Sequence, residues 1–94
     1  MDNSFTLRIN KTLYEELKKQ SDFLGIPIAA IIKFQLYLLQ NTKIDIIDVQ
    51  NVDSVRMSIK MPEHFFINVS NIAKSYGISM NQYINSIIFH FLNN

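Results

Sequence analysis

The feature that most constrains this chain is a pattern of alternating apolar and polar residues that occurs twice. Phe5, Leu7 and Ile9 are apolar and the residues between them are polar, which is the period of a β-strand with one buried face. The same alternation returns at 56–61. Each predicted strand is followed by a helical pattern, a glycine, an isoleucine and a second helical pattern. One strand-helix-helix unit is therefore written twice, with an offset of 52 residues.

The length of the chain implies that the two units share one core. A unit of about forty residues is too small to hold a core alone without disulfides, metal or association. Hydrophobic residues make up 48% of the chain, which is enough for a joint core. We predict an α+β fold, mostly α, in which residues 1–94 form one domain. Its parts are a first unit at 4–40, a linker at 41–53 and a second unit at 54–94.

Helix signals divide the two units in the same way. Asn10 is a good N-cap for the first helix, and Gly25 is suited to end it in a left-handed conformation. Pro27 fits the first turn of the next helix, predicted at about 27–40. In the second unit, Pro62 stands at the start of the first helix, Gly77 follows that helix, and Ser79 is a good N-cap for the last helix.

The second helices of the two units differ on one face. At a spacing of four, the first carries Ala30, Phe34 and Leu38, where the second carries Gln82, Ser86 and His90. The helix predicted at 27–40 also has a separate apolar core stripe, and a helix that is apolar on two sides is buried on two sides. We expect either the linker to cover this second stripe or two molecules to meet there.

The linker is unusually apolar for a free tether. Thirteen extended residues span on the order of 40 Å, whereas the helix before them is about 21 Å long. The linker can therefore run back across the domain and start the second strand beside the first. We expect part of it to pack against the domain, because it contains Ile44, Ile46, Ile47, Val49 and Val52.

The charge of the chain argues both for and against nucleic-acid binding. Nine basic and eight acidic residues give a net charge of +1, whereas a nucleic-acid-binding domain is usually clearly basic. Basic residues are concentrated, however, on or beside the polar faces of the predicted strands, at Arg8, Lys11, Arg56 and Lys60. The only acid expected nearby is Glu63, so this face is predicted to be positive.

The sequence gives little support for catalysis or metal binding. Both glycines are used at helix ends, so no phosphate-cradling loop remains. His64 and His90 lack the spaced acidic or cysteine partners of a metal site. The serines have no recognisable base and orienting acid. We predict a protein that is not an enzyme and that uses no cofactor and no metal.

The expected location is the cytoplasm. The chain has no cysteine, and its first residues lack the basic and apolar regions of a signal peptide. The longest apolar run, 26–39, is interrupted by polar residues and is shorter than the roughly 20 residues that cross a bilayer. We therefore expect a buried helix there and no membrane span.

Taken together, these residues resemble the ribbon-helix-helix DNA-binding family of the MetJ, Arc and CopG type. In the first unit the resemblance is carried by Arg-Ile-Asn-Lys-Thr-Leu-Tyr-Glu-Glu-Leu at 8–17 and Leu-Gly-Ile at 24–26. The second unit has Lys-Met-Pro-Glu-His-Phe at 60–65 and Tyr-Gly-Ile-Ser at 76–79. In that family two copies, normally on two chains, pair their strands into an antiparallel ribbon above four interlocked helices. The resemblance therefore implies a tandem protein, a single-chain pseudodimer.

The family's ribbon enters the major groove of DNA, and outward side chains of its strands read the bases. Carried over by position, the resemblance implies base contacts from Thr6, Arg8, Ser58 and Lys60. Arginine and lysine can donate to guanine O6 and N7, and hydroxyls adapt to several base edges, so Arg8 is the strongest candidate. Flanking contacts are implied for Ser4, Lys11 and Arg56. A solvated hairpin explains one such strand, whereas two matching strands favour DNA reading.

The family also docks the N-terminus of its second helix on a phosphate, through backbone N–H groups and often a hydroxyl. Ser79 and Asn81 suit this role in the second unit. The equivalent residues in the first unit are Pro27 and Ala29, which lack these groups. The outward residues of the two strands also differ, so we predict a target that is not a perfect palindrome.

The resemblance implies sequence-specific binding of double-stranded DNA, by a transcriptional repressor or a plasmid or phage accessory factor. The alternative is a protein-binding module on the same fold, such as an antitoxin or a phage-encoded inhibitor. That alternative is favoured by the low net charge and by the stripe of Ala30, Phe34 and Leu38, which offers a surface for self-association or a protein partner. A purely structural hairpin leaves the repeated basic strand face unexplained.

Overall fold

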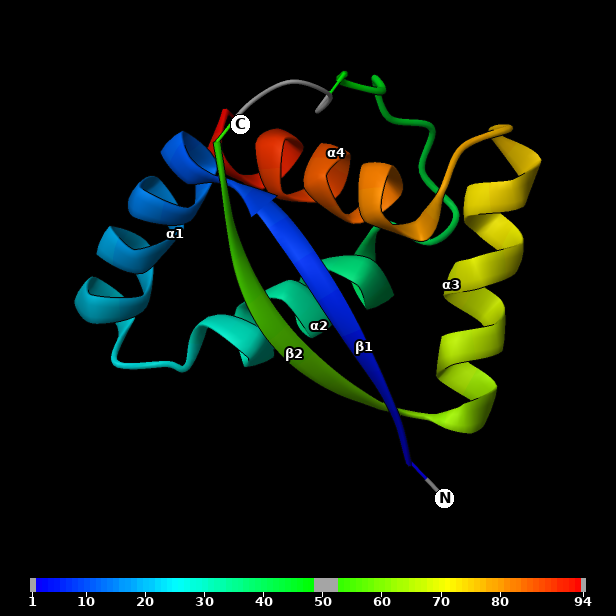
Figure 1. The fold of residues 1–94 in the computed structure, drawn as a ribbon, viewed down its shortest axis with the longest axis horizontal. Coiled ribbons are helices and arrows are strands. Elements are labelled where there is room, and N and C mark those ends of the chain that lie inside the picture. The colour runs from blue at the N-terminus through cyan, green and yellow to red at the C-terminus, as the bar shows by residue number, and fades with distance from the viewer. Residues whose placement is uncertain (1, 49–52, 94) are drawn as a thin grey trace.

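A computed structural model describes residues 2–48 and 53–93. The elements follow the order β1 (Asp2–Asn10), α1 (Lys11–Leu24), α2 (Ile28–Leu38), β2 (Ser54–Pro62), α3 (Glu63–Ser75) and α4 (Met80–Leu92). The two strands form an antiparallel sheet, and the helices lie behind and beside it (Figure 1). The predicted α+β class with mostly helical content is confirmed. Two linker residues that were expected to pack, Val49 and Val52, lie outside the described residues.

The paired strands form a ribbon with one buried and one exposed face. Corresponding elements of the two halves begin 52 residues apart, at 2 and 54, 11 and 63, and 28 and 80. The register places Thr6 opposite Ser58. The inner face of the ribbon has four fully buried side chains, Leu7, Ile9, Ile59 and Met61. The alternation in the sequence therefore gives the ribbon one face toward the helices and one toward solvent.

The helix boundaries follow the capping residues. The Asn10 side chain accepts a hydrogen bond from the Leu13 N–H at 3.1 Å, and the Ser79 side chain accepts one from the Gln82 N–H at the same distance. Gly25 has a φ of 68°, the left-handed conformation that favours glycine. The second helix is shorter than the predicted 27–40, because Pro27 is its N-cap residue and the helix ends at Leu38.

Helix α4 is the centre of the fold. It packs against α1, α2, α3 and β1. Six consecutive residues, 83–88, are buried, so this helix is surrounded over nearly two turns. Two of the six are polar, Asn85 and Ser86, and both are fully buried.

The linker lies along α4. Its Ile47 N–H donates to the Ser86 hydroxyl at 3.0 Å, and the Gln82 side-chain amide donates to the Ile47 carbonyl at 2.9 Å. The Ile44 N–H donates to the hydroxyl of Tyr76 at 3.2 Å, and the Ile44 side chain is buried. The expectation that part of the linker packs against the domain is therefore confirmed.

The expectation that the linker covers the apolar stripe of α2 is wrong. Phe34 and Leu38 remain 65% and 57% exposed. An extended segment cannot be buried unless its backbone N–H and C=O groups find partners. Gln82 and Ser86 provide these partners on α4, whereas the side chains of the α2 stripe cannot. Hydrogen bonding therefore directs the linker to the polar helix face.

No single helix among the described residues is long and apolar enough to cross a membrane. Helices α1 and α2 meet the length and composition criteria only as a pair, and the chain bends by 99° between them.

Tyr83 is a buried residue whose hydroxyl lacks a hydrogen-bond partner among the described residues. Its side chain is 1% exposed, and its ring stacks on that of Tyr76 with 5.7 Å between the centroids. Burial, with a further contribution from the neighbouring Tyr76, raises the pKa of Tyr83 from 10.0 to about 12. The folded state therefore favours the neutral phenol.

Replacement of Tyr83 by phenylalanine keeps the stacked ring and removes the unpaired hydroxyl. We expect the free energy of unfolding of Tyr83→Phe in urea to be unchanged or higher by about 1–2 kcal/mol at neutral pH. In the wild type, the neutral phenol of Tyr83 contributes fully to the free energy of unfolding below pH 10, and this contribution is lost as the pH rises from 10 towards 12. The variant has no phenol to titrate, so its stability should not show this fall. Tyr37→Phe, at a residue 59% exposed, is the control. A clear loss of stability in Tyr83→Phe would contradict the assignment of an unpaired hydroxyl.

Candidate nucleic-acid interface

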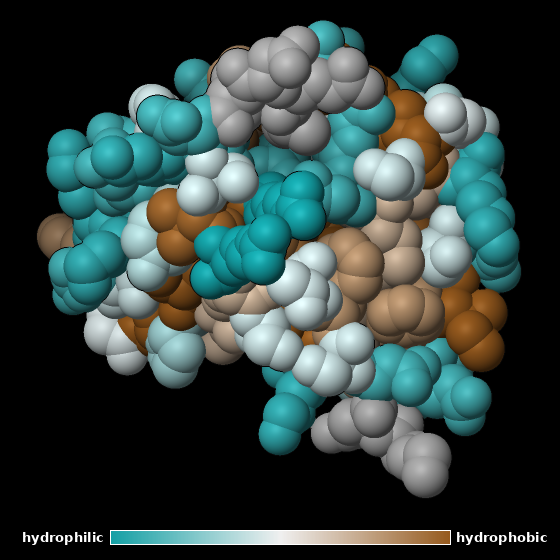
Figure 2. Space-filling model, viewed as in Figure 1, coloured by the Kyte–Doolittle hydropathy of each residue, from teal (hydrophilic) through white to brown (hydrophobic). Residues whose placement is uncertain are grey.

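The outward face of the ribbon carries polar side chains from both strands. All six are exposed, namely Ser4, Thr6, Arg8, Arg56, Ser58 and Lys60. In the space-filling view the surface over the ribbon is teal and white, with hydrophobic brown atoms to its sides (Figure 2). The structure therefore gathers all the predicted base-reading residues on one accessible face.

Arg8 and Arg56 stand directly opposite each other in the register. The Arg8 N–H donates to Asn81 and its carbonyl accepts from Asn85, so its backbone groups face away from β2. The two arginines therefore form a non-hydrogen-bonded pair, the kind in which opposed side chains come closest.

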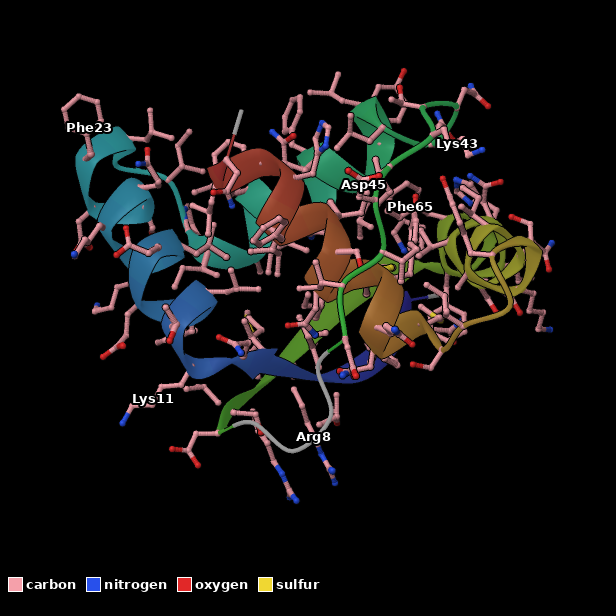
Figure 3. The ribbon with its side chains drawn as sticks, turned by 90° about the horizontal axis from the view of Figure 1, so that it is seen from above. Arg8, Lys11, Phe23, Lys43, Asp45 and Phe65 are labelled. Carbon is pink, nitrogen blue, oxygen red and sulfur yellow. The ribbon has the colours of Figure 1, made fainter. Side chains whose placement is uncertain are left out.

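The arginine pair brings two like charges together on the outward face of the ribbon. Like charges directly opposite each other on a sheet are destabilising. Neither arginine forms an ion pair with another described residue. Arg8 extends away from the body of the protein (Figure 3). One end of the ribbon thus presents two adjacent guanidinium groups, which an anion or a guanine edge would stabilise.

The other end of the ribbon has a different chemistry. Lys60 stands opposite Ser4, and the Ser4 and Ser58 hydroxyl oxygens lie 2.7 Å apart, within hydrogen-bond distance. This end carries one positive charge and a pair of hydroxyl groups. The two ends of the outward face are therefore unlike.

The prediction that Glu63 is the only acid near the basic face is wrong. Asp53 directly precedes β2, and its carbonyl accepts a hydrogen bond from the Lys11 N–H at 2.9 Å. Lys11 and Asp53 are both exposed at the end of the ribbon where Arg8 and Arg56 lie. Glu63 directly follows β2 at the opposite end. Each end of the ribbon therefore has an acid at its margin.

A hollow joins the ribbon to the N-terminus of α4. Its volume is about 350 Å³, and it is lined by Phe5, Thr6, Arg8, Ser79, Met80 and Asn81. Two predicted base-reading residues and two predicted phosphate-contacting residues thus share one concave surface. The first turn of α4, with backbone N–H groups that the helix itself does not use, opens beside it.

The side chains of Ser79 and Asn81 are already engaged in the fold. The Ser79 hydroxyl accepts from the Gln82 N–H, and the Asn81 oxygen accepts from the Arg8 N–H at 2.8 Å. Asn81 therefore fixes the backbone beneath Arg8. A phosphate at this helix end would be bound mainly by backbone N–H groups.

Asn85 is a positioning residue that sequence reasoning missed. Its oxygen accepts from the Asn10 N–H at 3.0 Å. Its nitrogen donates to the carbonyls of Arg8, at 2.9 Å, and Asn81, at 2.8 Å. The signal for it was a polar residue in the middle of the apolar stripe of the last helix, four residues after Asn81. Together the two asparagines hold the outer edge of β1 on α4.

The first half lacks this support. The residues equivalent to Asn81 and Asn85, 52 positions earlier, are Ala29 and Lys33. Alanine has no polar side-chain group and lysine has no acceptor, so neither can replace an asparagine. Pro27 caps α2 without a side-chain hydrogen bond. The N-terminus of α2 therefore lacks the side-chain groups that Ser79 and Asn81 provide at α4.

The described residues contain no group of three or more His, Cys, Asp or Glu side chains that could hold a metal ion. Comparison of the chain with protein-family models, with curated proteins and with solved structures gives no match. Function is therefore inferred from the residues of this chain and their arrangement.

Asn85→Ala tests the support of β1. The change leaves partly buried backbone groups of Arg8 and Asn10 without partners, so we expect the free energy of unfolding to fall by about 2–4 kcal/mol. The matched control is Lys33→Ala at the equivalent position of the first half, which should change it by less than about 0.5 kcal/mol. Urea denaturation of both variants gives the comparison. Equal losses in the two variants would show that Asn85 has no special role.

Proposed function

We propose that this chain is a ribbon-helix-helix pseudodimer that binds duplex DNA sequence-specifically, as a transcriptional repressor or a plasmid or phage accessory factor. The observation that carries the proposal is the outward face of the ribbon, where Arg8 and Arg56 stand opposed and exposed, with no ion-pair partner among residues 2–48 and 53–93. Opposed cations are unfavourable in the free protein and become favourable against the acceptor-rich major groove.

The strand register supports the pseudodimer. In the ribbon, residue numbers that face each other add up to 64, and equivalent residues of the two halves differ by 52. Thr6 and Ser58 satisfy both relations, because they occupy equivalent positions in the two halves and also face each other in the ribbon. An approximate two-fold axis through this pair would relate the halves, as the two-fold axis of a dimeric DNA-binding protein relates its two half-sites.

The proposed mechanism is occupancy of an operator, without chemistry. The ribbon enters the major groove, where Arg8 and Arg56 donate to guanine O6 and N7 or to phosphates. The hydroxyls of Thr6 and Ser58 adapt to the bases at the centre of the site. Backbone N–H groups of the first turn of α4 bind a phosphate of the flanking strand and set the register of the ribbon on the duplex.

The two halves would make unequal contacts with DNA. Helix α4 of the second half holds β1 through Asn81 and Asn85, and it begins with a hydroxyl N-cap. The half that includes α2 has Pro27 and Ala29 at the equivalent positions. The outward residues also differ between the two ends of the ribbon. The expected target is therefore an asymmetric sequence with its firmest phosphate contact on the α4 side.

The alternative function, a protein-binding module, is favoured by the apolar surface of α2, where Phe34 is 65% exposed. Such a module does not need the arginine pair on the ribbon. Loss of Arg8 would leave its activity unchanged, whereas a DNA reader would lose affinity.

Selection of bound duplexes from a random pool, with wild type and Arg8→Ala, tests the proposal. We expect one enriched, asymmetric motif for the wild type, and a loss of about 1–3 kcal/mol of specific binding in the variant. Folding should be unaffected because Arg8 is exposed. Lys43→Ala is the matched control for the loss of one charge, because Lys43 lies on the other side of the molecule (Figure 3).

Two results would remove the DNA-binding proposal. The first is the absence of any enriched motif. The second is weak binding that disappears with modest salt and responds equally to Arg8→Ala and Lys43→Ala, which indicates phosphate attraction without base reading.

A further inference from the structure

The two halves of the fold have equivalent grooves beside α2 and α4, and one of them is filled. In the second half the groove holds linker residues 44–47, which bond to Tyr76, Gln82 and Ser86. The equivalent residues in the first half are Leu24, Ala30 and Phe34. All three line an open hollow of about 250 Å³.

The open groove differs from the filled one in the chemistry that it offers. Tyr76, Gln82 and Ser86 each exchange a hydrogen bond with the backbone of the linker. Leu24, Ala30 and Phe34 have no side-chain donor or acceptor, and Gln35 is the only described residue lining this hollow that has either, so an extended backbone buried there would leave most of its groups unpaired. An occupant that fits this groove therefore has apolar side chains and a backbone whose N–H and C=O groups already bond to each other, as in a helix.

Phe34 forms a ridge between this hollow and a second one. The second hollow, of about 270 Å³, is lined by Lys33, Phe34, Tyr37 and Phe65. Phe34 and Tyr37 are 65% and 59% exposed, so both rings project next to the hollows. A surface that carries apolar ridges beside apolar hollows can pair with a copy of itself through a two-fold rotation.

We propose that two copies of this chain associate through the α2 surface, which we define as Leu24, Ile26, Ala30, Phe34, Tyr37 and Leu38. Phe34 of each copy enters the hollow beside α2 of the other. The occupant of each groove is then a helix, which meets the requirement for a backbone without unpaired groups. The interface is isologous, and each copy provides both the ridge and the hollow.

The size and charge of the α2 surface fit this partner. A fully buried aromatic side chain removes about 150–250 Å² from water, and five side chains of the α2 surface are 42–65% exposed in one copy, so the surface offers a few hundred Å² of apolar area per copy. A specific interface needs about 800 Å² per partner, which the surrounding polar residues can complete as a rim. Among the described residues that line the two hollows, Lys33 is the only charged one. No charge pattern there selects a charged partner.

Association through α2 leaves the ribbon free. Helix α2 lies behind the ribbon in Figure 1. Phe23, next to Leu24 of the α2 surface, points away from the side on which Arg8 projects (Figure 3). Back-to-back copies therefore expose both outward faces. Self-association does not depend on the proposed DNA binding, and either can fail without the other.

Sedimentation equilibrium of the purified chain, from micromolar to millimolar concentration, tests the proposal. We expect the wild type to reach twice the monomer mass of 11.0 kDa. Phe34→Lys should raise the dissociation constant at least about thirtyfold, because it puts a charge at the centre of the interface. Its circular dichroism and melting temperature should stay close to wild type, since Phe34 is exposed. The matched control is Ile67→Lys on α3, at a residue 51% exposed and outside the α2 surface, which should still dimerise.

Backbone amide NMR provides a second readout that locates the contact. Amide shifts of 24–38 should change with wild-type concentration, while those of β1 and β2 stay constant. A wild type that remains monomeric throughout the series overturns the proposal, whether or not it binds another protein. A dimer that survives Phe34→Lys also overturns it, since exchange of whole halves between chains would give that result. Equal dissociation by Ile67→Lys would assign the contact to another surface.

Discussion

The hydrogen bonds of two buried polar residues on α4 determine the layout of this fold. On one side of the helix, Asn85 binds the backbone of Arg8 and Asn10 at the outer edge of β1. On another side, Ser86 binds the backbone of Ile47 in the linker. A strand edge and an extended segment can be buried only where such partners exist. Helix α4 therefore fixes both the ribbon and the return path of the chain, and α2, which lacks these residues, stays open on the same face.

Local features of the fold could be predicted because they depend on neighbouring residues. The side-chain caps at Asn10 and Ser79 and the left-handed Gly25 all occur where the sequence indicates. The path of the linker could not be predicted by pairing its apolar side chains with the apolar stripe of α2. Covering the α2 stripe would gain about 25 cal/mol per Å² of buried apolar area, whereas each buried backbone group without a partner costs about 1–3 kcal/mol. Leaving unpaired the three groups that the linker pairs at Ile44 and Ile47 would cost about 3–9 kcal/mol, which is comparable to the gain from burying a few hundred Å² of apolar surface.

The candidate site shows the same division between local and distant information. The two-residue period was sufficient to place Thr6, Arg8, Ser58 and Lys60 on the outward face, and all four are exposed. The opposition of Arg8 and Arg56 depends on the register between strands that are nearly fifty positions apart in the sequence. The role of Asn85 depends on a contact with Asn10 across 75 positions. Neither follows from spacing within one element, because tertiary packing brings these residues together.

A single chain that contains both halves permits differences that two identical chains cannot have. In a homodimer each strand must present the same residues, and each second helix must offer the same face. Here one end of the ribbon has two arginines and the other has Lys60 and Ser4. Helix α4 binds the linker, whereas the equivalent face of α2 is open. Under the proposed function, the first difference lets one molecule read an asymmetric site without a second protein. Under the proposed self-association, the second difference would leave one associating surface per chain, so assembly would close at two copies, with their ribbons facing opposite ways.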